Sequence, residues 1–247
     1  MYRFFIKAEQ LNAEQIIIEG KDYNHIHNVL RMKPGEKILL CDGEDKEYLC
    51  VIKGYDVNRE QVLINIVDIF GNARELSCRI TLFQGYPKGD KLDMIVQKAV
   101  ELGAFEVVPV MMKRCVVKLD EKKAAKKVER LNAIALSAAK QSKRGMIPRV
   151  KPVMAMTEAV QYAREMDYII LPYEQAEGMT YSREVIKEAK YKDSIAVFIG
   201  PEGGFEPAEV ELIEKAGGKI ISLGHRILRT ETAGMAILSL LMYLLDE

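Results

Sequence analysis

Short apolar runs bounded by Gly, Asp or Pro pattern the first 70 or so residues of the chain. Four of them, at 15–20, 37–43, 47–56 and 61–70, are short and β-rich and predict strands of a small barrel or meander. A helix-like segment at 21–32 interrupts them before the turn KPGE. The stretch GNARELS then resembles a linker, so we expect one domain over 1–72 and a second over 73–247.

From Cys78 onward, continuous apolar runs alternate with amphipathic segments. The runs at 78–87, 105–112, 168–174, 194–204 and 219–228 predict strands, and helices are expected at 88–103, 120–145, 156–166, 182–190 and 206–218. Continuous apolar strands separated by helices predict an α/β domain with a parallel sheet covered on both faces. Ligands of such sheets bind beyond the carboxyl ends of the strands. The sequences LPYE, GPEGG and LGHRILRT lie at such ends, so we expect them to converge on one edge.

Composition fits a globular protein with ample core. The chain has 247 residues, 49% hydrophobic and 29% charged, with zero formal net charge. We expect a reducing, cytoplasmic location, because no apolar run approaches a bilayer span, the N-terminal segment lacks a signal-peptide pattern and the cysteines form no close pair. No metal is expected, because His25 and His27 are two residues apart and do not share a helix face.

The zero net charge conceals a basic segment. Between Met111 and Lys151 there are 13 Lys or Arg residues against 3 Asp or Glu, a local charge of +10. Within it, Val128, Leu131, Ile134 and Ala138 form an apolar stripe at helical spacing, so the outer face of this helix is densely basic. That face is either a solvated helix surface or a phosphate-binding surface.

The stretch FIGPEGGF joins an apolar strand to an acidic helix. Three glycines within five residues, Gly200, Gly203 and Gly204, exceed what a turn needs, although a plain strand-to-helix turn remains an alternative. The chain has neither a Rossmann fingerprint after its first α/β strand nor a P-loop, and Glu202 inside the loop would repel a triphosphate. No Ser-His-Asp arrangement is recognisable. An adenosine-bearing ligand without phosphates, such as S-adenosylmethionine, suits the remaining features.

FIGPEGGF followed by LGHRILRTETA resembles the paired C-terminal motifs of the RsmE-type 16S rRNA uridine N3-methyltransferases of the SPOUT superfamily. Three further segments resemble this family: KGDKLDMIVQKAVELGAFEVVPVMMKRCVVKL, IALSAAKQSKRGMIPRV, and the N-terminal YRFFI with HNVLRMKPGE. The resemblance implies a parallel-sheet SPOUT domain with a C-terminal trefoil knot, an N-terminal PUA-like β-barrel and a homodimer. It also implies methylation of uridine N3 in 16S rRNA of the small ribosomal subunit, with S-adenosylmethionine as cofactor.

The same resemblance implies the site residues. Cofactor binding is expected at Leu171, Pro172, Tyr173, Gly200, Pro201, Glu202, Gly203, Leu223, Gly224, Leu228, Arg229, Thr230, Glu231, Thr232 and Ala233, with the match at LPYE the loosest. The barrel and the basic segment are expected to bind RNA. The expected residues are Arg3, His25, Arg31, Lys88, Arg114, Lys122, Lys123, Lys126, Lys127, Lys143 and Arg144.

Uridine N3 is a poor nucleophile until it loses its proton, so a catalyst should stabilise the anion with a fixed cation near the uracil carbonyls. Arg229 is the candidate, and its alternative is an ion pair with Glu231 or Glu202. Glu231 is a candidate proton acceptor, or it serves the helix dipole, and Thr230 and Thr232 are equally well explained as helix caps. The general base stays unassigned.

The last helix, at 230–245, is apolar around most of its circumference, which favours a dimer contact over a helix sunk in a single core. Two other classes of function remain: a non-catalytic RNA-binding module, disfavoured by the intact cofactor motifs, and a dinucleotide-dependent enzyme, disfavoured by the missing fingerprint.

Overall fold

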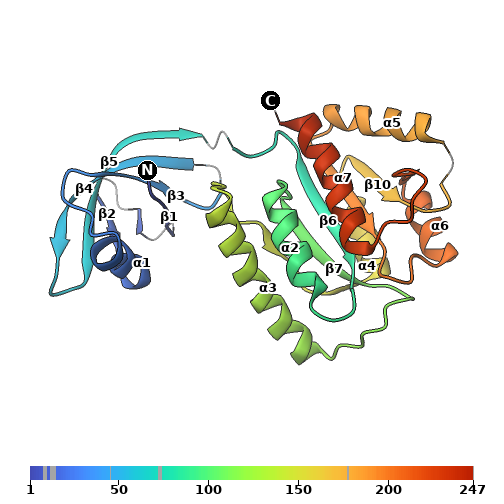
Figure 1. Ribbon diagram of the computed structural model, residues 1–247, viewed down its shortest axis with the longest axis horizontal. Coiled ribbons are helices and arrows are strands. Elements are labelled where there is room, and N and C mark those ends of the chain that lie inside the picture. Colours follow the sequence, from blue (N-terminus) through green and yellow to red (C-terminus); the bar gives the residue numbers. More distant parts are fainter. Residues whose placement is uncertain (8–9, 12–14, 45, 72–73, 177, 247) are drawn as a thin grey trace. The chain divides into compact units, whose positions relative to one another are not determined.

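The computed structural model describes residues 1–7, 10–11, 15–44, 46–71, 74–176 and 178–246, and Figure 1 shows its elements. The chain divides into two compact units. The first comprises Met1–Glu75 with Ala139–Ile147, and the second comprises Leu76–Ala138 with Pro148–Glu247. The predicted boundary between residues 72 and 73 lies outside the described residues and stays a prediction.

The first unit contains a five-stranded sheet in the order β1-β3-β4-β5-β2. Its strands are β1 (Arg3–Phe5), β2 (Gln15–Ile18), β3 (Lys37–Cys41), β4 (Lys46–Asp56) and β5 (Gln61–Gly71). The pair β1–β3 is parallel and the other pairs are antiparallel. Register shifts at Leu49/Cys50 and Ile52/Gly54 interrupt the β4–β5 ladder, and such irregularities bend and twist a sheet. The last four strands were predicted, whereas β1 was not.

The helical segment of the first unit is short and irregular. Helix α1 (Gly20–Asn24) continues into a π-helical turn at His25–Val29 (η2), so the helical segment begins one residue before the predicted range of 21–32 and ends within it. Tyr23 and Ile26 are its buried residues, and both belong to the core cluster of this unit. The helix therefore closes the hydrophobic face of the curved sheet.

The Glu75 carboxylate helps to hold the segment 139–147 in the first unit. Glu75 pairs with Arg144, whose Nε lies 3.0 Å from Glu75 Oε2. The backbone N–H groups of Gly145 and Met146 donate to Glu75 Oε1 at 3.2 and 3.3 Å. The Arg144 residue is 4% exposed, so this is a buried, charge-assisted network.

The second unit is built on a parallel sheet in the order β12-β10-β11-β6-β7-β8, with β9 paired to β7. The strands are β6 (Arg79–Gly85), β7 (Glu106–Met111), β8 (Arg149–Val150), β9 (Met154–Ala155), β10 (Tyr168–Pro172), β11 (Ser194–Ile199) and β12 (Lys219–Ile221). Every pairing among them is parallel. The five longer predicted strands are confirmed, and β8 and β9 are short additions.

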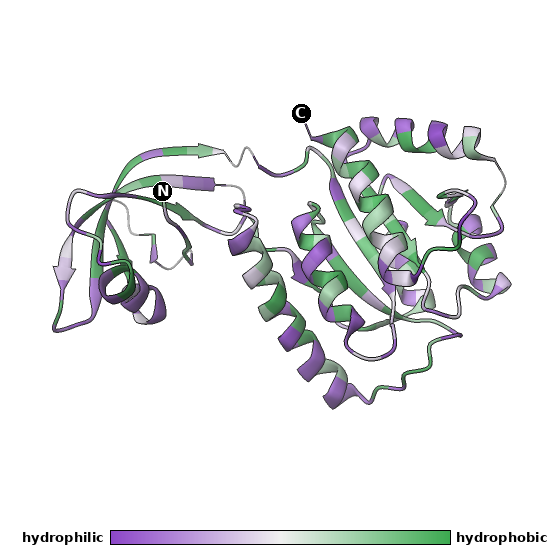
Figure 2. Cartoon of the chain, viewed as in Figure 1, coloured by the Kyte–Doolittle hydropathy of each residue, from purple (hydrophilic) through white to green (hydrophobic). Residues whose placement is uncertain are grey.

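Helices cover both faces of this sheet. They are α2 (Lys91–Glu101), α3 (Glu121–Gln141), α4 (Met156–Ala163), α5 (Met179–Glu188) with a 3₁₀ turn at Ala189–Tyr191 (η3), α6 (Pro207–Lys215) and α7 (Thr230–Leu245). Phe83 and Phe198 stack at 4.5 Å between ring centroids in the core cluster that includes α4 and α6 residues. Helix α7 packs on α2 and contacts β11. The strands are strongly hydrophobic in Figure 2, as a doubly covered sheet requires.

Helix α7 buries only part of its apolar surface. Ile237, Leu238, Leu241 and Leu245 are buried, while Leu240 is 48% and Tyr243 87% exposed. Among the described residues, no helix is both long and apolar enough to cross a membrane.

Candidate active site

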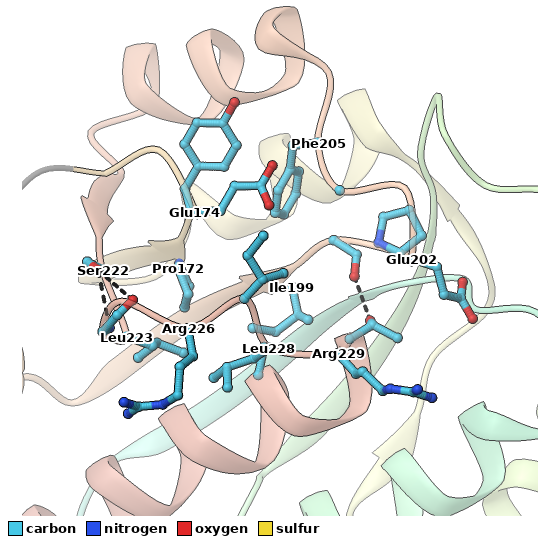
Figure 3. Close-up of a pocket in the computed structure, with 18 of the residues that line it drawn as sticks. Pro172, Glu174, Ile199, Glu202, Phe205, Ser222, Leu223, Arg226, Leu228 and Arg229 are labelled. Atoms are coloured by element: carbon cyan, nitrogen blue, oxygen red, sulfur yellow. Dashed lines mark hydrogen bonds between the residues drawn. The ribbon is translucent and has the colours of Figure 1, made fainter.

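A pocket of about 350 Å³ opens beyond the carboxyl ends of β10, β11 and β12 (Figure 3). Its walls come from Pro172–Glu174, from the loop after Ile199, and from the segment between Ser222 and Ala233. The convergence of LPYE, GPEGG and LGHRILRT on one edge of the sheet is therefore confirmed. The cause is the shared direction of parallel strands, which gathers the loops that follow them.

Most residues of the predicted cofactor set line this pocket. Those that do are Pro172, Tyr173, Gly200, Pro201, Glu202, Leu223, Gly224, Leu228, Arg229, Thr230 and Ala233. Four do not: Leu171 is a buried strand residue, Gly203 contacts Arg114, and Glu231 and Thr232 are in the first turn of α7 outside the lining.

The glycines of this region have separate structural reasons. A Cβ on Gly85 would lie 2.5 Å from the Pro201 nitrogen, so β6 can approach the loop only without a side chain. A Cβ on Gly200 would lie 3.1 Å from the Phe205 ring, and Gly204 has a φ of +69°. A Cβ on Gly203 would lie 2.9 Å from the Arg114 Cβ. A side chain at Gly203 would thus contact Arg114 and not enter the pocket.

Thr230 anchors the loop and does not cap its helix. Its hydroxyl donates to the Gly200 carbonyl at 2.6 Å and accepts from Gln84 Nε2 at 2.8 Å. Gln84 is fully buried on β6, and α7 has no side-chain N-cap hydrogen bond. The cap alternative for Thr230 is therefore wrong, because its hydroxyl is bonded to β6 and to the loop after β11, and not to the backbone of α7.

Lys91, at the start of α2, pairs with two acidic residues, Glu202 of the pocket lining and Glu231 of α7. Its Nζ lies 2.9 Å from Glu202 Oε1 and 3.5 Å from Glu231 Oε2. The backbone N–H of Lys88 also donates to both oxygens of Glu202, at 3.1 and 3.3 Å. Burial raises the pKa of the Glu202 carboxyl, but the hydrogen bonds from Lys91 and the backbone outweigh burial and hold that pKa below its ordinary value. The hydrogen bond to Glu202 is the main cause that raises the pKa of Lys91. Glu202 is therefore anionic, and Lys91 cationic, at neutral pH.

Arg229 differs from Lys91, because no carboxylate in the described part of the chain pairs with it. Among the described residues it makes no ion pair, whereas Glu202 and Glu231 both pair with Lys91. Figure 3 draws Glu202 and Arg229 on the same side of the pocket and Arg226 on the other. The alternative in which Arg229 pairs with Glu231 or Glu202 is thus not what the structure shows.

The loop between β7 and α3 is tied to the glycine loop and to α6. Arg114 Nε lies 2.7 Å from Glu206 Oε1, and its Nη1 donates to the Gly203 carbonyl at 3.0 Å. The backbone N–H of Lys113 donates to the buried Glu209 carboxylate at 2.8 Å. These contacts fix the far side of the glycine loop, whose near side forms the pocket.

Comparison with known proteins identifies the family. The RNA methyltransferase domain family matches residues 74–242, and the RNA methyltransferase PUA domain family matches residues 18–67. The chain is similar to ribosomal RNA small subunit methyltransferase E of Bacillus subtilis, at 37% identity over 98% of this chain and 96% of that protein. The Mycobacterium tuberculosis protein of the same name is 30% identical over 95% of this chain and 88% of its own length.

The chain belongs to the ribosomal RNA small subunit methyltransferase E family.

Solved structures agree with this assignment. A methyltransferase E of Neisseria gonorrhoeae, bound to S-adenosyl methionine, has a TM-score of 0.78 at 31% identity, covering 96% of this chain and 95% of that one. A putative methyltransferase of Legionella pneumophila, in complex with SAM, has a TM-score of 0.77 at 31% identity, covering 98% and 96%. The fold is accordingly an α/β SPOUT domain with a PUA-like N-terminal domain, as the sequence predicted. The trefoil knot stays a prediction.

The predicted RNA-binding residues of this methyltransferase E family member differ in availability. Lys122, Lys123 and Lys126 are exposed on α3, whose visible face is largely hydrophilic in Figure 2. Lys123 pairs with Asp120 at 3.0 Å, and Lys127 lies 3.7 Å from Asp90. Part of the basic face is therefore neutralised within the protein. His25, Arg31, Lys88 and Lys143 are also exposed, and Arg114 is paired as described above.

Arg3 and Arg144 are buried instead. The Arg3 side chain is 9% exposed, lies 2.7 Å from Glu47 Oε1 and donates to the Lys143 carbonyl at 2.8 Å. Arg144 is held by Glu75. Both guanidinium groups are committed to carboxylates inside the first unit, so we leave both residues out of the RNA-binding surface that we propose.

Glu174, Arg226 and Ile227 line the pocket within the segments LPYE and LGHRILRTETA, although they were not named one by one. Four lining residues lie outside LPYE, GPEGG and LGHRILRTETA: Lys91, Ile199, Phe205 and Ser222. Ile199, Phe205 and Ser222 each adjoin one of these segments, so widening the segments by one residue would have included them. Lys91 is different, since it comes from a helix more than 100 residues earlier and carries no local signal. Among the described residues, no cluster of three or more His, Cys, Asp or Glu is placed to hold a metal ion.

Proposed function

We propose that this protein is an S-adenosylmethionine-dependent methyltransferase that methylates N3 of a uridine in 16S rRNA of the small ribosomal subunit. The observation that carries the proposal is the pocket at the ends of β10, β11 and β12, in a chain whose family relatives bind S-adenosyl methionine in the same fold. We also propose a cytoplasmic location and a homodimer that uses the exposed face of α7.

The pocket chemistry fits the cofactor. Ile199, Leu223 and Leu228 give it apolar walls, and Gly200 and Gly204 leave backbone groups accessible beside them. Glu174 adds a carboxylate that favours a cationic ligand, while Glu202 is already neutralised by Lys91. When bound, S-adenosylmethionine supplies a methyl group activated by a positively charged sulfur. The residues that would hold it are the lining residues within Pro172–Glu174, Gly200–Glu202 and Leu223–Ala233.

The protein's own contribution to the reaction is charge stabilisation and positioning. Uridine N3 becomes nucleophilic when its proton leaves, and negative charge then spreads onto the neighbouring carbonyl oxygens. Arg229 is at the pocket, exposed and unpaired among the described residues, so its guanidinium is free to donate to those oxygens. The chain stabilises the anion with a donor already in place, and the group that accepts the proton is not assigned.

We predict that Arg229→Ala lowers the single-turnover rate of methylation on the order of 100- to 1000-fold while S-adenosylmethionine affinity changes little. Arg229→Lys should restore little, because an ammonium lacks the planar fork of the guanidinium. The measurements are calorimetric titration with S-adenosylmethionine and mass-spectrometric detection of N3-methyluridine in small subunits. Native protein that bound NAD and not S-adenosylmethionine would contradict the proposed function. An alanine variant that methylates at the native rate would remove Arg229 from the mechanism.

A further inference from the structure

Lys91 is the one lining residue of the pocket that comes from α2. Its ammonium group lies between two carboxylates, 2.9 Å from Glu202 and 3.5 Å from Glu231. The Lys91 side chain is 33% exposed, and Glu231 Oε2 is buried with no hydrogen-bond partner of its own. Lys91 therefore supplies the compensating charge for an otherwise unsatisfied oxygen.

Glu202 is a carboxylate of the same pocket lining as Arg229. Both residues line the pocket, and both lie on the same side of it in Figure 3. Glu231 follows Arg229 by two residues at the start of α7 and lies outside the lining, and residues two apart do not share a helix face. Without Lys91, the Lys88 backbone N–H would be the remaining donor to Glu202 from outside its own loop in the described part of the chain, and the Glu202 charge would attract the Arg229 guanidinium.

We propose that Lys91 is a positioning residue for methyl transfer: by pairing with Glu202, and in part with Glu231, it keeps the Arg229 guanidinium free for the nucleic-acid base. This inference rests on the proposed function. Lys91 acts through Arg229 and makes no contact with the reacting atoms. It sets the charge of the pocket wall so that one arginine remains available to an electron-rich substrate.

The test begins with Lys91→Met, which keeps the aliphatic stem and removes the charge. We expect the single-turnover rate to fall about 10- to 100-fold. This loss is smaller than that from removing Arg229, because a partly exposed ion pair between Glu202 and Arg229 would form only part of the time. The dissociation constant for S-adenosylmethionine should change by less than about 3-fold. Lys91→Arg, which preserves the charge, should retain most of the rate. Lys98→Met is the matched control, because it removes another ion pair of α2, with Glu101 at 2.7 Å.

Two combined variants separate positioning from a purely structural role. In an Arg229→Ala background, Lys91→Met should cost nothing further, because its target is already absent. Adding Glu202→Gln to Lys91→Met should raise the rate several-fold above that of Lys91→Met alone, because the competing charge is gone.

Additive losses in the Arg229→Ala background, or no recovery with Glu202→Gln, would overturn the inference and leave the proposed function standing. Equal losses of rate, cofactor affinity and thermal stability in Lys91→Met would also overturn it. A native protein that transfers no methyl group would instead refute the proposed function, and this inference with it.

Discussion

At the scale of single residues, the pocket depends on which charges are already paired. Arg3, Arg114 and Arg144 look alike in the sequence as cations available to RNA, yet each makes an ion pair in the structure. Arg229 makes none among the described residues. The difference lies in the carboxylates that the fold places beside each one, so residue type alone does not mark a functional cation.

Gly203 shows the same dependence on its surroundings. The resemblance placed Gly203 in the expected cofactor-binding set. Because a Cβ there would lie 2.9 Å from the Arg114 Cβ, we now expect valine to destabilise the protein by about 1–3 kcal/mol through overpacking. Urea unfolding measures this change. Gly54→Ala is the control, since no atom lies within 4 Å of its added Cβ. If the free energy of unfolding of Gly203→Val equalled that of the native protein, the Arg114 side chain would have to move aside without destabilising the fold.

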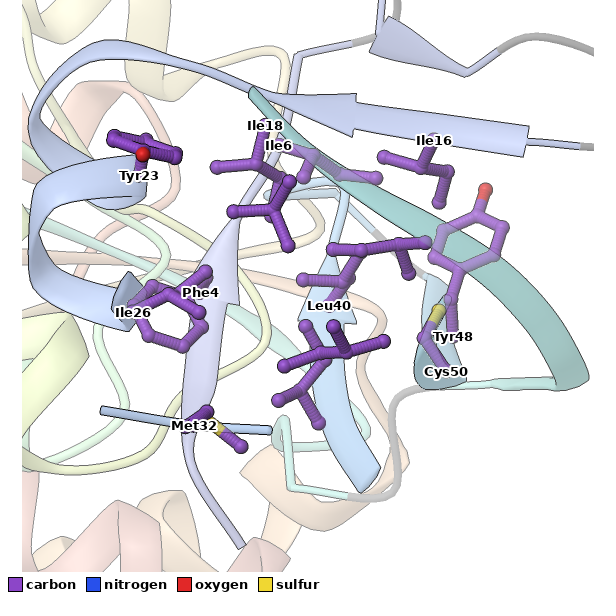
Figure 4. Close-up of a cluster of buried hydrophobic side chains, with 14 residues drawn as sticks. Phe4, Ile6, Ile16, Ile18, Tyr23, Ile26, Met32, Leu40, Tyr48 and Cys50 are labelled. Atoms are coloured by element: carbon purple, nitrogen blue, oxygen red, sulfur yellow. The ribbon is translucent and has the colours of Figure 1, made fainter. Parts of the chain in front are cut away.

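At the scale of elements, hydrophobic periodicity predicted the long strands and helices well. The strands of the first sheet alternate buried and less buried residues, and their inward side chains form the core in Figure 4. The elements that were missed, β1, β8 and β9, have two or three residues each, too short to show a period. Helix α3 was predicted over 120–145 and spans Glu121–Gln141, with Leu131, Ala135 and Ala138 buried beneath its basic face.

Helix α3 carries a prediction about RNA binding. Among the described residues, Lys122 and Lys126 make no ion pair, and they lie one helical turn apart on an exposed face. Their joint reversal to Glu should weaken RNA binding and reduce the slope of log affinity against log salt by about 1–2 units. Filter binding across a salt series measures the slope. The matched control is Arg183→Glu with Lys187→Glu, an exposed pair at the same spacing on α5. Equal slopes for the native protein and the α3 variant would show that this face of α3 is exposed to solvent and does not bind RNA.

At the scale of the whole molecule, the exposed part of α7 leaves apolar surface without a partner in the single chain. Leu240 and Tyr243 are one turn apart, and Met94 of the adjacent helix α2 is 39% exposed. A symmetric dimer would bury this surface twice, once from each subunit, which makes α7 the natural place for a two-fold axis.

We predict that Leu240→Glu combined with Tyr243→Glu converts the proposed dimer to a monomer, because the two-fold axis would bring four buried charges together. Sedimentation velocity at micromolar concentration measures the mass. Val57→Glu, which changes an equally exposed apolar residue in the first unit, should leave the dimer intact. Native protein that sediments as a monomer would refute the dimer, and α7 would then serve only the core of its own chain.

The sequence by itself determined the α/β alternation, the parallel sheet and the convergence of three motifs on one edge, because the periods and strand ends that carry this information are local. Only the tertiary structure decided which charged side chains form ion pairs. Lys91 reaches Glu202 from 111 residues away, and Arg144 reaches Glu75 from 69 residues away. An ion pair depends on which side chains the fold brings within about 4 Å, and the spacing of residues along the chain does not contain that distance.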